Sequence, residues 1–217
     1  MKKSIFAVML AAVLALGTAG CLKNTTEQDK AFVCGTVNGN VYESKFSGLK
    51  LTAPEGWEYS TDEELLEMME LAGDEFTDDA EKKAAELSKQ KTIYDAMLMD
   101  TESGTNVIIM YENMSASIGG SLYSPKEYSD LLKNGASEEE GYREIADEET
   151  EFCGEKYHSL IWRSVNENDV EIEQCTLVRK VDNYMLAIVF SYIPDDGMPE
   201  SLMEMFEKLP AAPADAA

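Results

Sequence analysis

The sequence is poor in basic residues and has a single histidine. Its 217 residues include 18 Lys and Arg against 42 Asp and Glu, which gives a net charge of −24. Because a polyanionic surface repels another polyanion, this balance argues against nucleic acid as a partner. Apolar residues still make up 44% of the chain. That share is ordinary for a globular protein, and a chain of this length can bury a core without disulfide staples.

Motifs for nucleotide, zinc or triad chemistry are also missing. The sequence has no GxGxxG or GxxxxGK[ST] loop, no Gly-x-Ser-x-Gly elbow and no CxxC pair. A His-based dyad would have to use His158, which we place in the middle of a strand as a structural or surface residue. We therefore expect no catalytic residue, no metal site and no cofactor.

No apolar run reaches the roughly 20 residues that a membrane-spanning helix needs. The run that comes nearest, Ile5 to Leu16, follows Lys2 and Lys3. A short apolar stretch behind positive charges is typical of a secretory signal peptide. The chain is therefore expected to carry a signal peptide at its N-terminus and no transmembrane helix.

The end of this run is more specific. The letters LGTAGC over residues 16–21 resemble the lipobox of bacterial lipoproteins, with Thr18 where that family usually has Leu. The resemblance implies cleavage before Cys21, a diacylated Cys21 and a protein anchored to the extracytoplasmic face of the cell membrane by lipid. The alternative is an ordinary secretory cut after Ala19.

These features divide the chain into four parts. We expect a signal peptide over residues 1–20, a lipid-anchored flexible tether over 21–34, a single domain over 35–209 and a disordered tail over 210–217. The oligomeric state is left open.

Periodicity and turn residues predict the elements of the domain. A capping box at Ser60 or Thr61 starts one helix, and Ser124 with Pro125 starts another. The remaining helices are expected at Thr77–Lys89 and Ser201–Leu209. The expected strands are Val37–Glu43, Gly48–Thr52, Ile93–Met99, Asn106–Glu112, a short one at Tyr142–Ile145, Lys156–Ser164, Val170–Val181 and Tyr184–Ile193.

The strand over 184–192 is apolar on both faces, so both faces of its sheet must be covered. Hairpin connections make that sheet mostly antiparallel. The pattern predicts an α+β fold, a three-layer α/β/α sandwich around a mostly antiparallel sheet.

The order of elements resembles the PsbP-like superfamily. The most similar motif is Pro54-x-Gly56-Trp57, which follows the second strand and precedes the first helix. The segments 48–69 and 182–190 also look like parts of a group of uncharacterised lipoproteins from Gram-positive gut bacteria. The superfamily resemblance implies binding and assembly roles without catalysis, and it supplies no catalytic residues.

Three cysteines remain once Cys21 carries lipid. A hairpin loop at 166–169 would place Cys175 opposite Leu160 and Cys153 opposite Asp182, which argues against a Cys153–Cys175 bridge. Small core residues are the favoured interpretation of these two cysteines, a disulfide the alternative. Cys34 is left unassigned.

Three functions follow as hypotheses. The first is a non-catalytic binding or assembly domain at the cell surface, with an extracytoplasmic protein as a possible partner. The second is an acidic surface protein that binds a divalent cation, although no EF-hand spacing is present. The third is a hydrolase that uses a pair of its many carboxylates.

Overall fold

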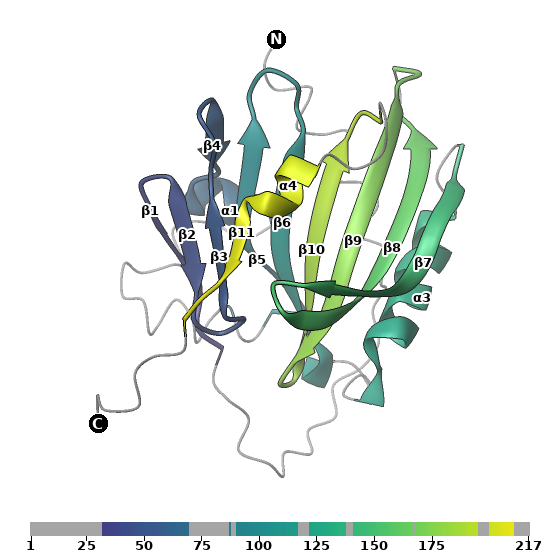
Figure 1. Cartoon of the computed structure of the whole chain (residues 1–217). Helices are drawn as coiled ribbons and strands as arrows, with labels where there is room; N and C mark the ends of the chain where they lie inside the picture. Colours follow the sequence, from purple (N-terminus) through teal and green to yellow (C-terminus); the bar gives the residue numbers. More distant parts are fainter. Residues whose placement is uncertain are drawn as a thin grey trace.

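A computed structural model of the chain describes residues 32–69, 87, 90–116, 122–137, 141–166, 168–194 and 200–210. Two antiparallel sheets and a few short helices make up this part of the chain (Figure 1). The α+β class with a mostly antiparallel sheet is thus confirmed. The helix expected over Thr77–Lys89 lies outside the described residues apart from Leu87.

The large sheet has seven strands in the order β4-β5-β6-β10-β9-β8-β7. Each pair of neighbours in it is antiparallel. The three C-terminal strands form the expected meander, and Asp182, in the turn before β10, has a φ of 55°. The bounds are β4 (Trp57–Tyr59), β5 (Thr92–Asp100), β6 (Asn106–Asn113), β7 (Arg143–Phe152), β8 (Glu155–Val165), β9 (Glu171–Val181) and β10 (Tyr184–Tyr192).

The small sheet has four strands in the order β1-β2-β3-β11. Its bounds are β1 (Thr36–Asn38), β2 (Val41–Ser44), β3 (Leu49–Thr52) and β11 (Phe206–Lys208). The helical elements are α1 (Asp62–Met68), the single 3-10 turn η3 (Met114–Ala116), α3 (Pro125–Ala136) and α4 (Glu200–Glu204).

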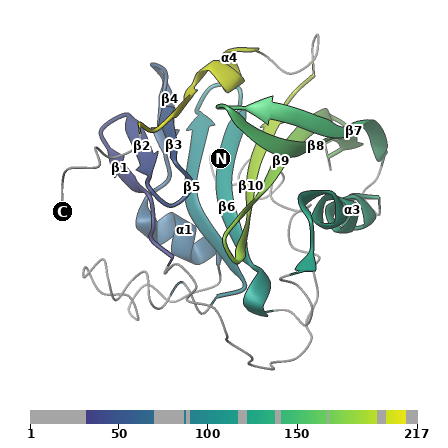
Figure 2. The same ribbon diagram turned by 60° about the horizontal axis from the view of Figure 1, so that its bottom comes forward.

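Alternation along β10 divides the core into two faces. Leu186, Ile188 and Phe190 point to the sandwich face, which the small sheet and Leu202 of α4 cover. The odd positions of β10 point to the helical face, which α1 and α3 cover (Figure 2). Helices therefore lie on both faces as expected, and the small sheet joins α4 on one of them.

Three expected elements were wrong. The strand over Val37–Glu43 is two strands, because Gly39 with a φ of 62° turns the chain between β1 and β2. The short strand at Tyr142–Ile145 extends to Phe152, since it pairs with β8 along its length. The helix over Ser201–Leu209 ends at Glu204, because β11 leaves the helical path to pair with β3.

An aromatic box closes one end of the sandwich face. Phe32 is 4% exposed, and its ring centroid lies 5.2 to 5.3 Å from those of Phe46, Tyr111 and Tyr184. Such edge-to-face and tilted pairs add stabilisation beyond the area they bury. The packed part of the chain thus includes Phe32, within the stretch expected to be a flexible tether.

Candidate functional site

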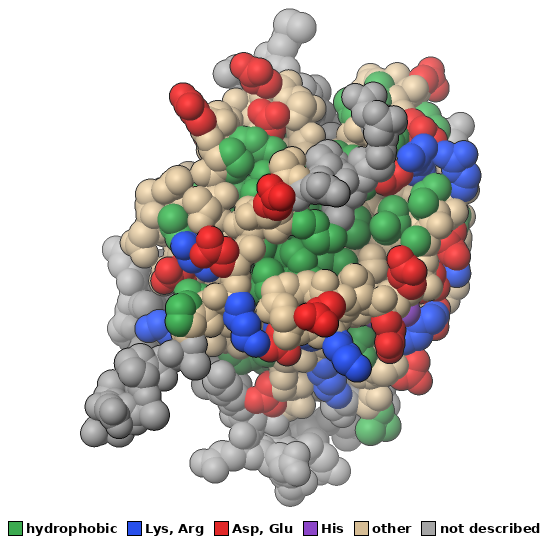
Figure 3. Space-filling view, in the orientation of Figure 1, with side chains coloured by type: hydrophobic (Ala, Val, Ile, Leu, Met, Phe, Trp, Pro, Cys, Tyr) green, Lys and Arg blue, Asp and Glu red, His purple; other side chains and the backbone are tan. Residues whose placement is uncertain are grey.

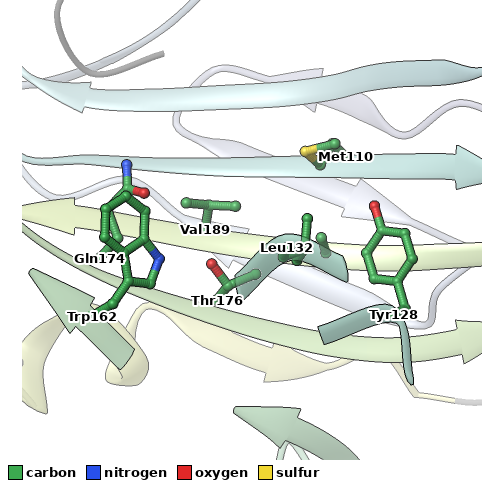
Figure 4. Close-up of a pocket in the computed structure, with 8 residues that line it drawn as sticks. Met110, Tyr128, Leu132, Trp162, Gln174, Thr176 and Val189 are labelled. Carbon is green, nitrogen blue, oxygen red and sulfur yellow. The ribbon is translucent and has the colours of Figure 1, made fainter. Parts of the chain in front are cut away.

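A pocket opens between α3 and the helical face of the large sheet. Its cavity volume is about 10 Å³, which is about the room that one water molecule needs. In Figure 4, Trp162 and Gln174 lie toward one end, Tyr128 lies at the other, and Val189, Thr176 and Leu132 lie between them. We call this the α3 pocket, and its lining is Met110, Tyr128, Leu132, Trp162, Gln174, Thr176, Ala187 and Val189.

The helix α3 forms one wall of the α3 pocket, and a capping box in the sequence determines where this helix begins. The Ser124 side chain accepts a hydrogen bond from the Glu127 backbone N–H, and the Glu127 carboxylate accepts one from the Ser124 N–H. This is the expected capping box, with Pro125 at the start of the helix. Tyr128 and Leu132, four residues apart, then lie on the same side of α3 and face the sheet.

Two polar side chains break the apolar lining. Gln174 is 5% exposed, and its Nε2 donates to Ser191 Oγ at 3.0 Å. Thr176 is equally buried. Apolar walls with the Gln174 amide and the hydroxyls of Thr176 and Tyr128 have the composition of a binding site, because the apolar area supplies affinity and the polar groups fix orientation.

A buried carboxyl group lies on the same face as the Tyr128 end of the α3 pocket. Glu112 is 5% exposed, accepts a hydrogen bond from Thr92 Oγ1 at 2.9 Å and lies 3.4 Å from Lys91 Nζ. Burial raises the pKa of Glu112 despite these two partners. Burial, followed by the charge of Glu112 and then Tyr94, raises the pKa of Tyr128 well above its usual value.

His158 forms a buried pair with Asp147. Its Nε2 lies 2.5 Å from Asp147 Oδ1, and the His158 side chain is 6% exposed. Asp147 also lies 3.4 Å from Lys126 Nζ and 3.5 Å from Lys133 Nζ, both on α3. Burial acts to raise the pKa of Asp147, but the His158 hydrogen bond and the charge of Lys126 outweigh it and hold the pKa below its usual value. The group links α3 to β7 and β8.

Two further carboxylates on the sandwich side are satisfied in the same way. Glu173 accepts a hydrogen bond from Tyr192 Oη at 2.5 Å and another from Arg163 Nε. Asp95, at the β-bulge in β5, accepts one from Tyr42 Oη at 2.5 Å and one from the Gly35 N–H at 3.0 Å. These contacts connect strands, and neither carboxylate lines the α3 pocket.

The structure describes three of the four residues singled out from sequence, and they form a turn away from the α3 pocket. Pro54 and Gly56 are exposed, and Gly56 has the positive φ of 86° that the turn requires. Trp57 is half-buried at the start of β4, pairs with Asp100 and packs against the sandwich-face core. The fourth residue, Cys21, lies outside the described residues.

The cysteines Cys34, Cys153 and Cys175 are free thiols. Cys175 is a buried residue of β9, as the favoured interpretation expected, whereas Cys153 lies in the turn between β7 and β8 with a φ of 51°. The expected register was wrong by one residue. Cys175 lies opposite Ile161, because Val165 pairs with Glu171 rather than with Val170. Burial raises the pKa of Cys175 to about 12.

The cation hypothesis finds no cluster in the part of the chain that the structure describes. Within these ranges no three or more His, Cys, Asp or Glu side chains are grouped so that they could hold a metal ion. The acidic runs at 70–79 and 138–140 lie outside them. Within the same ranges, no helix has the length and hydropathy to cross a bilayer.

The sequence analysis did not identify the α3 pocket, which the buried Trp162 lines at 4% exposure. One signal was available. Gln174 and Thr176 are polar side chains at alternate positions of β9, and they share a face because they are two residues apart.

Matches to known proteins are found among solved structures. No family model matches the chain, and no curated protein matches it. A protein of unknown function from Pseudomonas aeruginosa, PA94, shares 11% identity over 41% of this chain at a TM-score of 0.33, and the chain spans 60% of its length.

Two further structures match a larger share of the chain. LpqN from Mycobacterium tuberculosis, described as involved in cell envelope biogenesis, has 9% identity, coverage of 75% of this chain and 83% of that one, and a TM-score of 0.41. The cyanobacterial PsbP (CyanoP) from Synechocystis has 11% identity, coverage of 89% and 98%, and a TM-score of 0.42.

Proposed function

We propose that this chain is a lipid-anchored extracytoplasmic protein whose domain binds a partner or ligand without catalysis, and that the α3 pocket receives an apolar group of that partner. The lipobox-like segment ending at Cys21 supports the anchor. We also propose that the chain is related to PsbP-like proteins and to lipoproteins of Gram-positive gut bacteria, which it resembles in sequence.

One observation carries the binding role. The α3 pocket is lined by apolar and aromatic side chains with one amide and two hydroxyls, while the chemically versatile His158 is 6% exposed and held by Asp147. A general base must reach the proton that it removes. His158 is closed off from such a substrate. The α3 pocket has to widen to admit a group, because its lining residues other than Leu132 are themselves 1–5% exposed.

Crosslinking in living cells tests the proposal on the native, anchored protein. A photoreactive residue replaces Leu132, at the α3 pocket, and in a matched strain it replaces the exposed Glu58 on β4. Mass spectrometry should find a stoichiometric adduct at position 132 and a much weaker one at position 58. Equal labelling at both positions would contradict the pocket, and turnover of a wall, glycan or peptide substrate by the purified protein would contradict the non-catalytic role.

The anchor is tested separately. Replacing Cys21 with Ala should move the protein from the membrane fraction to the soluble extracytoplasmic fraction, because no acceptor for lipid then remains at this position. Retention of Cys21→Ala in the membrane fraction would reject the lipid anchor at this residue.

A further inference from the structure

The two sheets end in four edge strands, and one of these differs from the rest. β1, β4 and β11 have three residues each, whereas β7 has ten. Short edge strands are a common protection against unwanted pairing. β7 is long enough for another strand to pair along it.

The outer side of β7 has no strand partner among the residues that the structure describes. β7 pairs with β8 on one side and is the last strand of the large sheet. Successive backbone groups of an edge strand point alternately toward the neighbour and away from it, so about half of its N–H and C=O groups face outward. An added strand would satisfy these groups by β-augmentation.

The negative charge on β7 favours a positively charged segment as the strand that pairs with it. Glu148, Glu149 and Glu151 are exposed, and none has a cation within 4.0 Å in the described part of the chain. Asp147 and Glu144, by contrast, are neutralised by lysines of α3. Acidic and basic side chains are interspersed along the margin of the molecule where β7 lies (Figure 3).

This charge disfavours a second copy of the chain as the occupant. Two β7 strands paired edge to edge would bring carboxylates against carboxylates, and like charges directly opposite each other are destabilising. A segment rich in Lys and Arg would place its cations beside the three free carboxylates instead. The net charge of −24 attracts such a segment from a distance.

We propose that the outer edge of β7 is a docking surface for an extended basic segment of a partner protein, which adds to the large sheet as its eighth strand. The surface lies on β7, apart from the α3 pocket, whose lining includes no β7 residue. The proposal deepens the binding role proposed above by naming a second contact and the chemistry of its partner.

Hydrogen exchange on the full-length purified protein tests the pairing. The probe is a synthetic eight-residue peptide of alternating Lys and Val with blocked ends. Alternate backbone amides of β7 should become at least tenfold more protected when the peptide is present, while those of β1 and β4 do not change. An absence of protection in β7 would overturn the proposal.

Charge variants distinguish binding of the peptide at β7 from non-specific attraction to the negative net charge of the protein. E148Q/E149Q/E151Q should weaken peptide binding about tenfold at low salt, since each exposed ion pair contributes a modest amount. The control E43Q/E58Q/E102Q removes the same charge from exposed positions on β2, β4 and the β5–β6 turn, and it should weaken binding less than threefold. Equal weakening by both would overturn the proposal.

The result is independent of the crosslinking at position 132. An adduct at the α3 pocket without protection of β7 would reject the edge and leave the binding role intact. Protection of β7 without a pocket adduct would reject the pocket and support the edge.

Discussion

The sandwich face and the helical face of the large sheet bury their side chains in different ways. The sandwich face forms one continuous cluster in which aromatic rings pack edge to face. The helical face carries three separate clusters, and buried polar residues such as Gln174, Thr176 and Glu112 lie on the same face as they do. Continuous packing favours rigidity, whereas polar groups within an apolar surface provide recognition.

The largest expected effect lies on the sandwich face. Phe190 is 0% exposed and packs against Phe152 and Phe206. Phe190→Ala should lower the free energy of unfolding by about 3–5 kcal/mol, because it removes buried contacts and leaves a cavity. Urea unfolding followed by circular dichroism measures this. A loss below about 1 kcal/mol would show that the sandwich face is not the main source of stability.

A smaller effect is expected where α3 is held on the helical face. Asp147→Asn removes the negative charge that faces His158, Lys126 and Lys133, and it should cost about 1–3 kcal/mol near pH 7.

The pH dependence of that loss has a defined sign. The folded pKa of Asp147 is lowered, so its contribution is complete above the unfolded value of about 4 and disappears as pH falls through the lower folded pKa. The difference between wild type and Asp147→Asn in unfolding free energy should therefore shrink on acidification. A difference that stayed constant down to about pH 2 would contradict the role of the charge.

A substitution at the N-cap of α3 tests the stability of this helix, which forms one wall of the α3 pocket, separately from the rest of the fold. Ser124→Ala removes the acceptor for the Glu127 N–H and should cost about 1 kcal/mol. Hydrogen exchange should speed up in the first turn of α3, while Leu186 and Ile188 on β10 stay protected. Equal acceleration in both places would mean that the two faces unfold together.

The smallest effect is expected on β7. E148Q/E149Q/E151Q replaces three exposed carboxylates without a described cation partner, so the unfolding free energy should change by less than about 0.5 kcal/mol. Thermal unfolding at matched ionic strength measures this. A loss above about 1 kcal/mol would assign these side chains a structural role and remove them as candidates for docking.

Local signals in the sequence predicted the elements that depend on neighbouring residues. The capping box at Ser124, the turn at Asp182 and the two-faced apolar strand β10 all follow from positions a few residues apart. They were enough to predict an antiparallel sheet covered on both faces.

Features that depend on distant pairing could not be predicted in this way. β11 is a strand because Phe206 lies beside Leu51, more than 150 residues earlier. The acidic stretch 143–152 becomes a long strand because β8 offers nine matching positions, although Glu is a poor strand former. The α3 pocket needs strands β6, β8, β9 and β10 together with α3, so the shared face of Gln174 and Thr176 is as much of it as a local pattern indicates.

The box around Phe32 also has a mechanical consequence. Among the described residues, a pull from the N-terminal side reaches Phe32 first and must draw its ring from among Phe46, Tyr111 and Tyr184. The hydrogen bonds from Gly35 to Asp95 then resist the force before it reaches β1. Tension applied at this end of the chain would thus be transferred to the strands at the centre of the fold, and the short outer strand β1 would be shielded from peeling.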